Sequence, residues 1–252
     1  MRRTGRQHRE TMSVRLPDGR ETSLLRVADP NARRLRLRVT ERGARLTVPS
    51  VVSDDEVSRF LQRHLDWLSE QLRADPTSPV QTGGLEPMHT AHLPLRGVQL
   101  AVQWHEARWL HVQQRDEKLV IGSPPGSPIS QVRQALREFY LTEARADLGR
   151  WLPRYLPGLP RPPRQWRIRP LSSLWGSLSS SDVMSLDLAL ILAPPAAFEY
   201  VLVHELCHLI QANHSRAFWR EVELRFPAWR AQRDWLRDEG RSVKRDLHCL
   251  LN

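Results

Sequence analysis

Three histidines and a glutamate near residue 210 have a spacing that could hold a metal ion. His204 and His208 lie four residues apart, Glu205 follows His204 directly, and His214 comes six residues after His208. Positions i and i+4 share one face of an α-helix, so both imidazoles could bind one Zn²⁺ ion. Glu205 could then handle the proton of a water on the ion. With His214 as third ligand, the fourth position stays open, which is typical of catalytic zinc sites.

This pattern also occurs by chance on helices, where it is only a solvated face of histidine and glutamate. Here its context favours a metal. Pro194 and Pro195 precede the segment, and proline is tolerated in the first turn of a helix. Two histidines and a glutamate on a buried helix need partners, because unpaired buried polar groups are costly. The apolar residues that predict burial are Ala197, Phe198, Val201, Leu202, Leu206 and Leu209.

The composition sets wide limits on function. The chain has 252 residues, 40% of them hydrophobic, and a net charge of +10. Basic surfaces attract polyanions, so nucleotides or nucleic acid are possible partners, although an Arg-rich solvated surface explains the charge equally well. No apolar run reaches the ~18 residues of a membrane span, so no membrane partner is expected. Two cysteines make no disulfide framework, and the N-terminus lacks a secretory signal, which favours the cytoplasm.

Composition and periodicity divide the chain into three parts. Residues 1–20 are expected to be a flexible, basic N-terminus, residues 21–126 a β-rich region, and residues 127–252 the region with the histidines. Residues 33–39 and 44–48 alternate as paired strands do. Ser53 and Glu56 form a predicted capping box before an amphipathic helix. Further helices are expected over about 129–152, after Ser215, and over about 228–239, with Gly240 as the residue that ends the last one.

The segment just before the histidine helix is predicted to be a pair of strands. Residues 174–179 and 183–188 have strand character, with a turn at 180–182. An extended substrate can add to an open strand edge by main-chain hydrogen bonds, and Trp175, Gly176 and Ser177 are candidates for that edge. The alternative is an ordinary sheet hairpin without a binding role.

Five sequence blocks carry a resemblance to a known family. They are Trp175–Ser177, Leu190–Pro195, His204–Leu209, Asn213–Ser215 and Phe218–Trp219. In order and spacing they resemble the YgjP-like metallopeptidase family, which is related to SprT-like peptidases. The resemblance implies a zinc-dependent hydrolase with His204, His208 and His214 as ligands of one ion and Glu205 as the catalytic carboxylate. The chain departs from the family pattern at Leu174, where a basic residue is common, and at Leu178, where the family has cysteine.

The expected fold is α+β, with a zincin-like core in which the active-site helix packs under a small sheet, preceded by a β-rich region with one or two helices. The expected activity is cleavage of peptides or unfolded proteins by a zinc-activated water, with Glu205 as general base and acid. Two alternatives stay open: a metal-dependent nucleoside triphosphate pyrophosphatase, and a peptidase docked to DNA through Arg34, Arg36 and Arg38. Glu221 and Asp187 are candidates to orient a ligand histidine, and Glu221 could replace His214 as a ligand.

Overall fold

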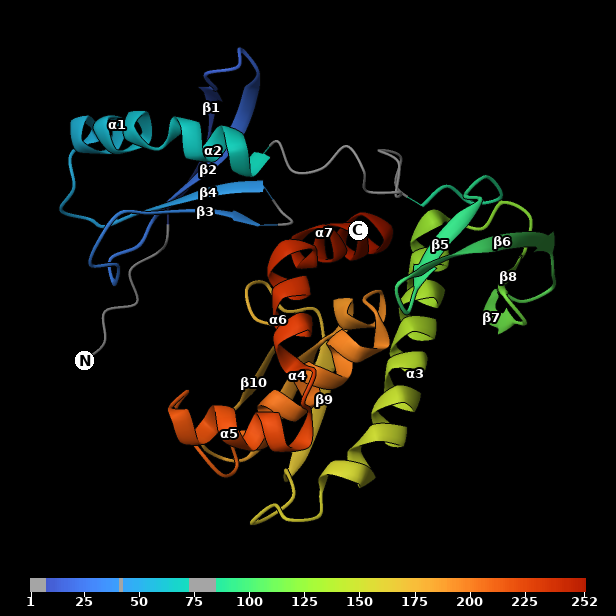
Figure 1. Ribbon diagram of the computed structural model, residues 1–252. Helices are drawn as coiled ribbons and strands as arrows, with labels where there is room; N and C mark the ends of the chain where they lie inside the picture. The colour runs from blue at the N-terminus through green and yellow to red at the C-terminus, as the bar shows by residue number, and fades with distance from the viewer. Residues whose placement is uncertain (1–7, 41–42, 73–84) are drawn as a thin grey trace. The chain divides into compact units, whose positions relative to one another are not determined.

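The computed structural model describes residues 8–40, 43–72 and 85–252. The contacts divide the chain into two compact units, Met1–Thr77 and Ser78–Asn252. The fold class is α+β, as predicted, and both units combine small sheets with helices (Figure 1). Among the described residues, no helix has the length and the apolar character needed to cross a membrane.

The N-terminal unit is a four-stranded sheet with two helices. Its strands are β1 (His8–Arg15), β2 (Glu21–Ala28), β3 (Arg36–Thr40) and β4 (Gly43–Val48), in the order β1-β2-β4-β3. Strands β2 and β4 are parallel, and the other two pairs are antiparallel. The helices are α1 (Asp54–Arg63) and α2 (Leu65–Leu72). Leucines and valines from both layers form the core: Leu24, Leu46, Val48, Val57, Leu61 and Leu68.

The capping box predicted before α1 is present. The Ser53 hydroxyl accepts the Glu56 backbone N–H, and the Glu56 carboxylate accepts the Ser53 backbone N–H.

The expectation that residues 1–20 are loosely ordered is wrong for residues 8–15, which pair with β2 along their whole length as strand β1. The reason lies in an alternation hidden by the polar composition: Met12 and Val14 pack against the core, and Leu16 is buried in it.

The C-terminal unit begins with a four-stranded sheet of β5 (His92–Leu95), β6 (Val98–Glu106), β7 (His111–Arg115) and β8 (Lys118–Ser123), in the order β5-β6-β8-β7. The boundary predicted after residue 126 does not coincide with the boundary between the compact units, which lies between Thr77 and Ser78. The reason is that this sheet shares a core with the rest of the C-terminal unit. Leu93 and Ile121 belong to the same buried cluster as Leu136 and Leu190. The proline-rich stretch after β8 is therefore a turn inside one unit.

Three further strands and five helices complete this unit. The long helix α3 (Ile129–Tyr155) precedes a three-stranded sheet of β9 (Gln165–Arg169), β10 (Gly176–Leu178) and β11 (Val183–Asp187), in the order β10-β11-β9. The remaining helices are α4 (Pro195–Cys207), α5 (Arg216–Arg225), α6 (Trp229–Asp238) and α7 (Gly240–Leu251). Helix α4 packs against α3, α5 and α6, and against β10 and β11 (Figure 1). This is the predicted core, in which the helix that carries the histidine motif packs against a small sheet.

Helix α6 ends at Asp238 with Glu239 as its C-cap, so it stops before Gly240 as predicted, but Gly240 begins a further helix, α7, which the sequence did not predict. The absence of a side chain at Gly240 allows a close contact with Trp175. A Cβ atom on Gly240 would lie 2.4 Å from Cζ2 of Trp175, far inside normal contact. Glycine here therefore lets the Trp175 ring pack directly against the start of α7, next to the strand that faces the histidines.

Candidate metal centre

Helix α4 holds the first two histidines of the motif. It begins after Pro194, with Pro195 in its first turn, and its residues from Ala197 to Cys207 are mostly buried. The regular helix ends at Cys207, one residue earlier than the motif would suggest. His208 nevertheless keeps right-handed helical backbone angles, φ −67° and ψ −17°. The i and i+4 relation between His204 and His208 is therefore preserved.

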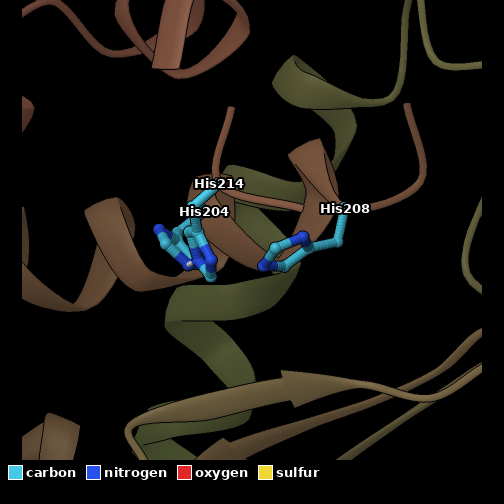
Figure 2. Close-up of side chains that lie close together, drawn as sticks. All are labelled: His204, His208 and His214. Atoms are coloured by element: carbon cyan, nitrogen blue, oxygen red, sulfur yellow. Dashed lines mark hydrogen bonds between the residues drawn. The ribbon is translucent and has the colours of Figure 1, made fainter. Parts of the chain in front are cut away.

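The loop after α4 brings the third histidine back to the first two. Ser215 is the N-cap of α5, since its hydroxyl accepts the Phe218 backbone N–H at 3.3 Å. This cap fixes the chain immediately after His214. The three rings converge, with one nitrogen from each within 4.8 Å of the others (Figure 2). His204 Nε2 and His214 Nε2 lie 3.0 Å apart.

The surroundings keep lone pairs available on two of the rings. Burial, followed by the nearby His208 and His214, lowers the pKa of His204 to about 3. Burial also lowers the pKa of His208. His208 Nδ1 lies 3.1 Å from the carbonyl oxygen of Gln211, which can only accept, so Nδ1 carries the proton and donates. The Nε2 atom of His208 is then left with its lone pair.

Two aromatic residues of α5, which form one of the five blocks of the family resemblance, hold the histidine rings in place, and the sequence did not predict this contact. The fully buried Phe218 ring contacts all three histidines, with centroid distances of 4.9, 4.6 and 4.8 Å to His204, His208 and His214. Trp219 lies 5.8 Å from both His204 and His214. Such contacts restrict the side-chain torsions of the rings. Phe218 and Trp219 lie four and five residues after His214, and this spacing was the available sequence signal.

Glu205 is buried against the backbone of strand β10. Its side chain is enclosed so fully that burial raises the pKa of its carboxyl to about 8. A Cβ atom on Gly176 would lie 2.6 Å from Glu205 Cγ and 2.7 Å from Oε1. The glycine at this position therefore makes room for the carboxylate. The family block Trp175–Ser177 and the histidine motif, which are distant in sequence, meet at this contact.

A cavity of about 860 Å³ opens over these groups. His204, Glu205 and His208 lie on one side of it, and strand β10 lies on another. The residues at which the chain departs from the family pattern, Leu174 and Leu178, both line it. The other lining residues are Arg161, Trp175, Gly176, Ser177, Ser179, Ser180, Asp182, Tyr200, Val201, Ala212, His214, Arg233, Leu236 and Arg237.

Strand β10 is an edge strand beside this cavity. It pairs with β11 through Gly176–Leu178, and within residues 8–40, 43–72 and 85–252 it has no strand on its other side. The predicted strand pair is therefore present, although β10 is only three residues long. An edge of this kind leaves main-chain N–H and C=O groups available to an added strand.

Neither proposed orienting carboxylate contacts a histidine among the described hydrogen bonds. Glu221 accepts from Arg225, one turn further along α5. Asp187 instead supports the strand pair: it pairs with Lys244 and accepts the backbone N–H groups of Leu171 and Ala189 at 3.3 and 3.1 Å. The group that contacts His208 is instead the Gln211 carbonyl. Main-chain carbonyls carry no sequence signature, so this partner could not be identified in advance.

Lys244 connects α7 to the segment in front of β10. Its ammonium group donates to the carbonyl oxygens of Leu171 and Leu174, both at 2.9 Å, and to the Asp187 carboxylate. The same ammonium lies 4.4 Å from the centre of the Trp175 ring. It thus fixes the residues that lead into the cavity edge.

The donor set fits a zinc ion. Three imidazoles converge, at least two of them are held neutral or in a defined tautomer, and the cavity leaves one side open for a water or a substrate. The Nδ1 atom of His204 is buried without a hydrogen-bond partner in the described structure. The other ring nitrogen of His204, Nε2, lies 3.0 Å from His214 Nε2 and is the atom that would meet a bound cation. Within the described ranges, no second group of metal-ligating side chains converges in this way.

Comparisons with known proteins show the family to which the chain belongs. A family model described as "YgjP-like, metallopeptidase domain" matches residues 33–239. The crystal structure of the metallopeptidase zymogen of Pyrococcus abyssi abylysin is similar in sequence, with 33% identity over 41% of this chain and 92% of that chain, and a TM-score of 0.28. No curated protein matches the chain.

Proposed function

The chain belongs to the YgjP-like family of metallopeptidases, and from that premise we propose that it cleaves peptide bonds with one zinc ion held by His204, His208 and His214. The donor set described above supports zinc, since three imidazoles with an open fourth position are typical of catalytic zinc sites. When bound, the ion supplies a Lewis acid that polarises the scissile carbonyl and makes water more acidic.

Glu205 is the proposed general base. Its carboxylate takes the proton of the attacking water and later delivers it to the leaving amine nitrogen. Burial supports this role, because a carboxyl whose pKa is raised to about 8 holds a proton more readily than an exposed one. The close packing of Gly176 against the side chain limits the positions that the carboxylate can take.

One observation carries the choice of a peptide as substrate: residues of β10, which among the described residues is an edge strand, line the same cavity as the histidines and Glu205. A peptide that adds to this edge would bind through its main chain, largely irrespective of its side chains. Trp175, Gly176 and Ser177 are the proposed binding residues. Extended main chain is exposed in unfolded proteins and loops, which are therefore the proposed substrates.

Turnover of an unfolded protein and of nucleoside triphosphates, measured side by side, tests this proposal. Each substrate is assayed with zinc added and with zinc removed by a chelator. We expect zinc-dependent cleavage of the protein only. Zinc-dependent release of phosphate or pyrophosphate without proteolysis would overturn the assignment.

A nucleotide hydrolase is the second candidate, because three arginines line the cavity: Arg161, Arg233 and Arg237. The planar guanidinium group of arginine presents N–H donors that match the oxygen atoms of a phosphate group. All three are already engaged: Arg161 binds Asp182, Arg237 binds Asp234 and Asp238, and Arg233 lies 3.7 Å from Asp234. This leaves less positive charge for a triphosphate than the number of arginines suggests, and it favours the peptide.

A cytoplasmic location is also proposed. Both cysteines are free, with Cys207 buried and Cys249 exposed. An exposed free thiol is typical of proteins in reducing compartments.

A further inference from the structure

Strand β3 of the N-terminal unit has an open edge beside a hollow in the surface. In the order β1-β2-β4-β3 it pairs with β4, and the part of the chain that the structure describes places no strand on its other side. Two adjoining hollows, of about 860 and 320 Å³, run between this edge and helices α1 and α2. They share Arg34, Leu35 and Phe60 among their lining residues. We call them together the β3 groove.

The groove has an apolar floor. Leu35 and Leu37 point to the helix side of the sheet, where they pack against the core together with Phe60. Trp67 of α2 lines the same hollow with 38% of its surface exposed. The Phe60 and His64 rings are stacked at 4.2 Å, which gives the floor a fixed shape. Side chains of an added strand that point to this side would meet apolar surface.

The rim of the groove is basic. Arg34, Arg59 and Arg63 line it and are exposed, and the described ion pairs give none of them a carboxylate partner. Glu56 is the one acidic residue among the lining residues, and its carboxylate is already bound to Ser53 in the capping box. With three arginines and one glutamate, the residues that line this hollow carry a net positive charge.

The other face of β3 is basic as well. Arg36 and Arg38 alternate with Leu35 and Leu37, so they lie on the opposite face of the strand and are exposed. Arg38 stands directly across from Arg45 of β4. Like charges opposite one another destabilise a sheet. The Nε atom of Arg45 is moreover buried and lacks a hydrogen-bond partner within the described ranges.

From these observations we propose that the β3 groove binds an extended peptide segment in which apolar and acidic side chains alternate. The segment pairs with the open edge of β3 through its main chain. Its alternate side chains point to opposite faces, as in any strand. One set fills the apolar floor by Leu37, Phe60 and Trp67, and the other set places carboxylates beside Arg36 and Arg38. The site would recruit acidic segments to the chain.

A peptide is favoured over a nucleic acid because the edge offers main-chain groups in strand spacing, which a phosphodiester backbone cannot match. A strand also explains the separation of apolar and basic side chains on the two faces of β3. A nucleic acid would require the basic rim alone. The two partners differ in one measurable respect, which is whether the peptide N–H groups of the ligand are needed.

Fluorescence anisotropy with the full chain tests the proposal, with a chelator present so that proteolysis cannot remove the ligand. The probe is a labelled octapeptide of alternating glutamate and valine. Two further versions carry N-methyl groups, one on the odd and one on the even residues. We expect binding of the parent peptide, and a loss of at least tenfold in affinity for one methylated version only. Equal binding of all three would overturn strand addition, and tighter binding of an oligodeoxynucleotide of equal charge would replace the peptide by nucleic acid.

Two charge-reversal variants locate the site. Arg36→Glu with Arg38→Glu should weaken binding of the parent peptide at least tenfold. The matched control, Arg108→Glu with Arg115→Glu, changes the net charge equally at exposed positions of the C-terminal unit and should bind within twofold of the unchanged chain. Equal weakening in both variants would show non-specific attraction and overturn the proposal. Because no zinc is needed, the result is independent of whether the chain proves to be a peptidase.

Discussion

Gly176 of strand β10 packs against the side chain of Glu205, with room for a hydrogen but not for a methyl group between them. This contact joins the cavity edge to the carboxylate beside the histidines. Strand β10, which is proposed to bind the substrate, and Glu205, the proposed base, therefore hold each other in position through direct contact.

Replacing Gly176 by alanine should therefore reduce activity without unfolding the chain. The new Cβ would lie 2.6 Å from Glu205 Cγ, so the carboxylate or the strand must move. A displacement of about 1 Å near a reacting group can lower kcat/KM by about 100-fold. The measurement is kcat/KM on an unfolded protein substrate, together with the zinc content. Gly149→Ala is the control, because a Cβ there meets nothing within 4 Å; it should leave activity unchanged, and equal activity of both variants would refute the steric account.

Removal of the metal should lower both activity and stability. A ligand that binds only the folded state at about 100 times its Kd stabilises that state by about 2.7 kcal/mol. Alanine substitution of His204, His208 or His214 should abolish this gain, whereas His89→Ala, at an exposed position, should retain it. Thermal unfolding with and without zinc, combined with metal analysis of dialysed protein, measures the effect. If His214→Ala retained one zinc per chain with unchanged affinity, His214 would not be a ligand.

The features of the fold and of the site that depend on local spacing could be predicted from the sequence. Neighbours within a few residues set the histidine spacing, the paired strands before α4 and, in the N-terminal unit, the Ser53 capping box. The packing role of Gly240 could not be predicted, because it depends on Trp175, which comes from another part of the chain. Strand β1 was missed because its outward-facing polar residues obscure the inward positions of Met12 and Val14.

The contact between Asp187 and Lys244 illustrates the same limit. Taken alone, each residue is typical of an exposed charge on the surface. From the sequence, Asp187 is predicted only as a partner for a histidine. In the structure, the Asp187 side chain is 2% exposed and that of Lys244 is 12% exposed. The pairing follows from the packing of α7 against the short helix Leu188–Ile191, which directly follows Asp187, and no local pattern specifies this packing. Burial outweighs the nearby ammonium and raises the pKa of Asp187.

Lys244→Met should strongly destabilise the C-terminal unit. It leaves the Asp187 carboxylate buried without its cation and removes the donor for two carbonyl groups. Breaking a buried pair by removing one partner costs about 3–5 kcal/mol. The free energy of unfolding from denaturant titration measures the loss. Lys118→Met replaces an exposed lysine and should change this free energy by less than about 0.5 kcal/mol.

A second substitution separates charge from packing at this pair. Adding Asp187→Asn to Lys244→Met removes the buried charge and should recover part of the lost stability. If the single and double variants unfolded at the same denaturant concentration, the loss would come from the lysine stem and its contact with Trp175, and not from an unpaired carboxylate.

The most direct test of the central claim is the zinc content and the peptide turnover of Glu205→Gln. The amide keeps the shape of the side chain but cannot take a proton, so zinc should bind as before while kcat falls by about 100- to 10,000-fold, the range attributed to general acid–base catalysis. Glu199→Gln makes the same change on the same helix, where the carboxylate binds Arg154 and Tyr155, and it should keep full activity. A zinc-loaded Glu205→Gln chain that cleaves protein as fast as the unchanged chain would contradict the account.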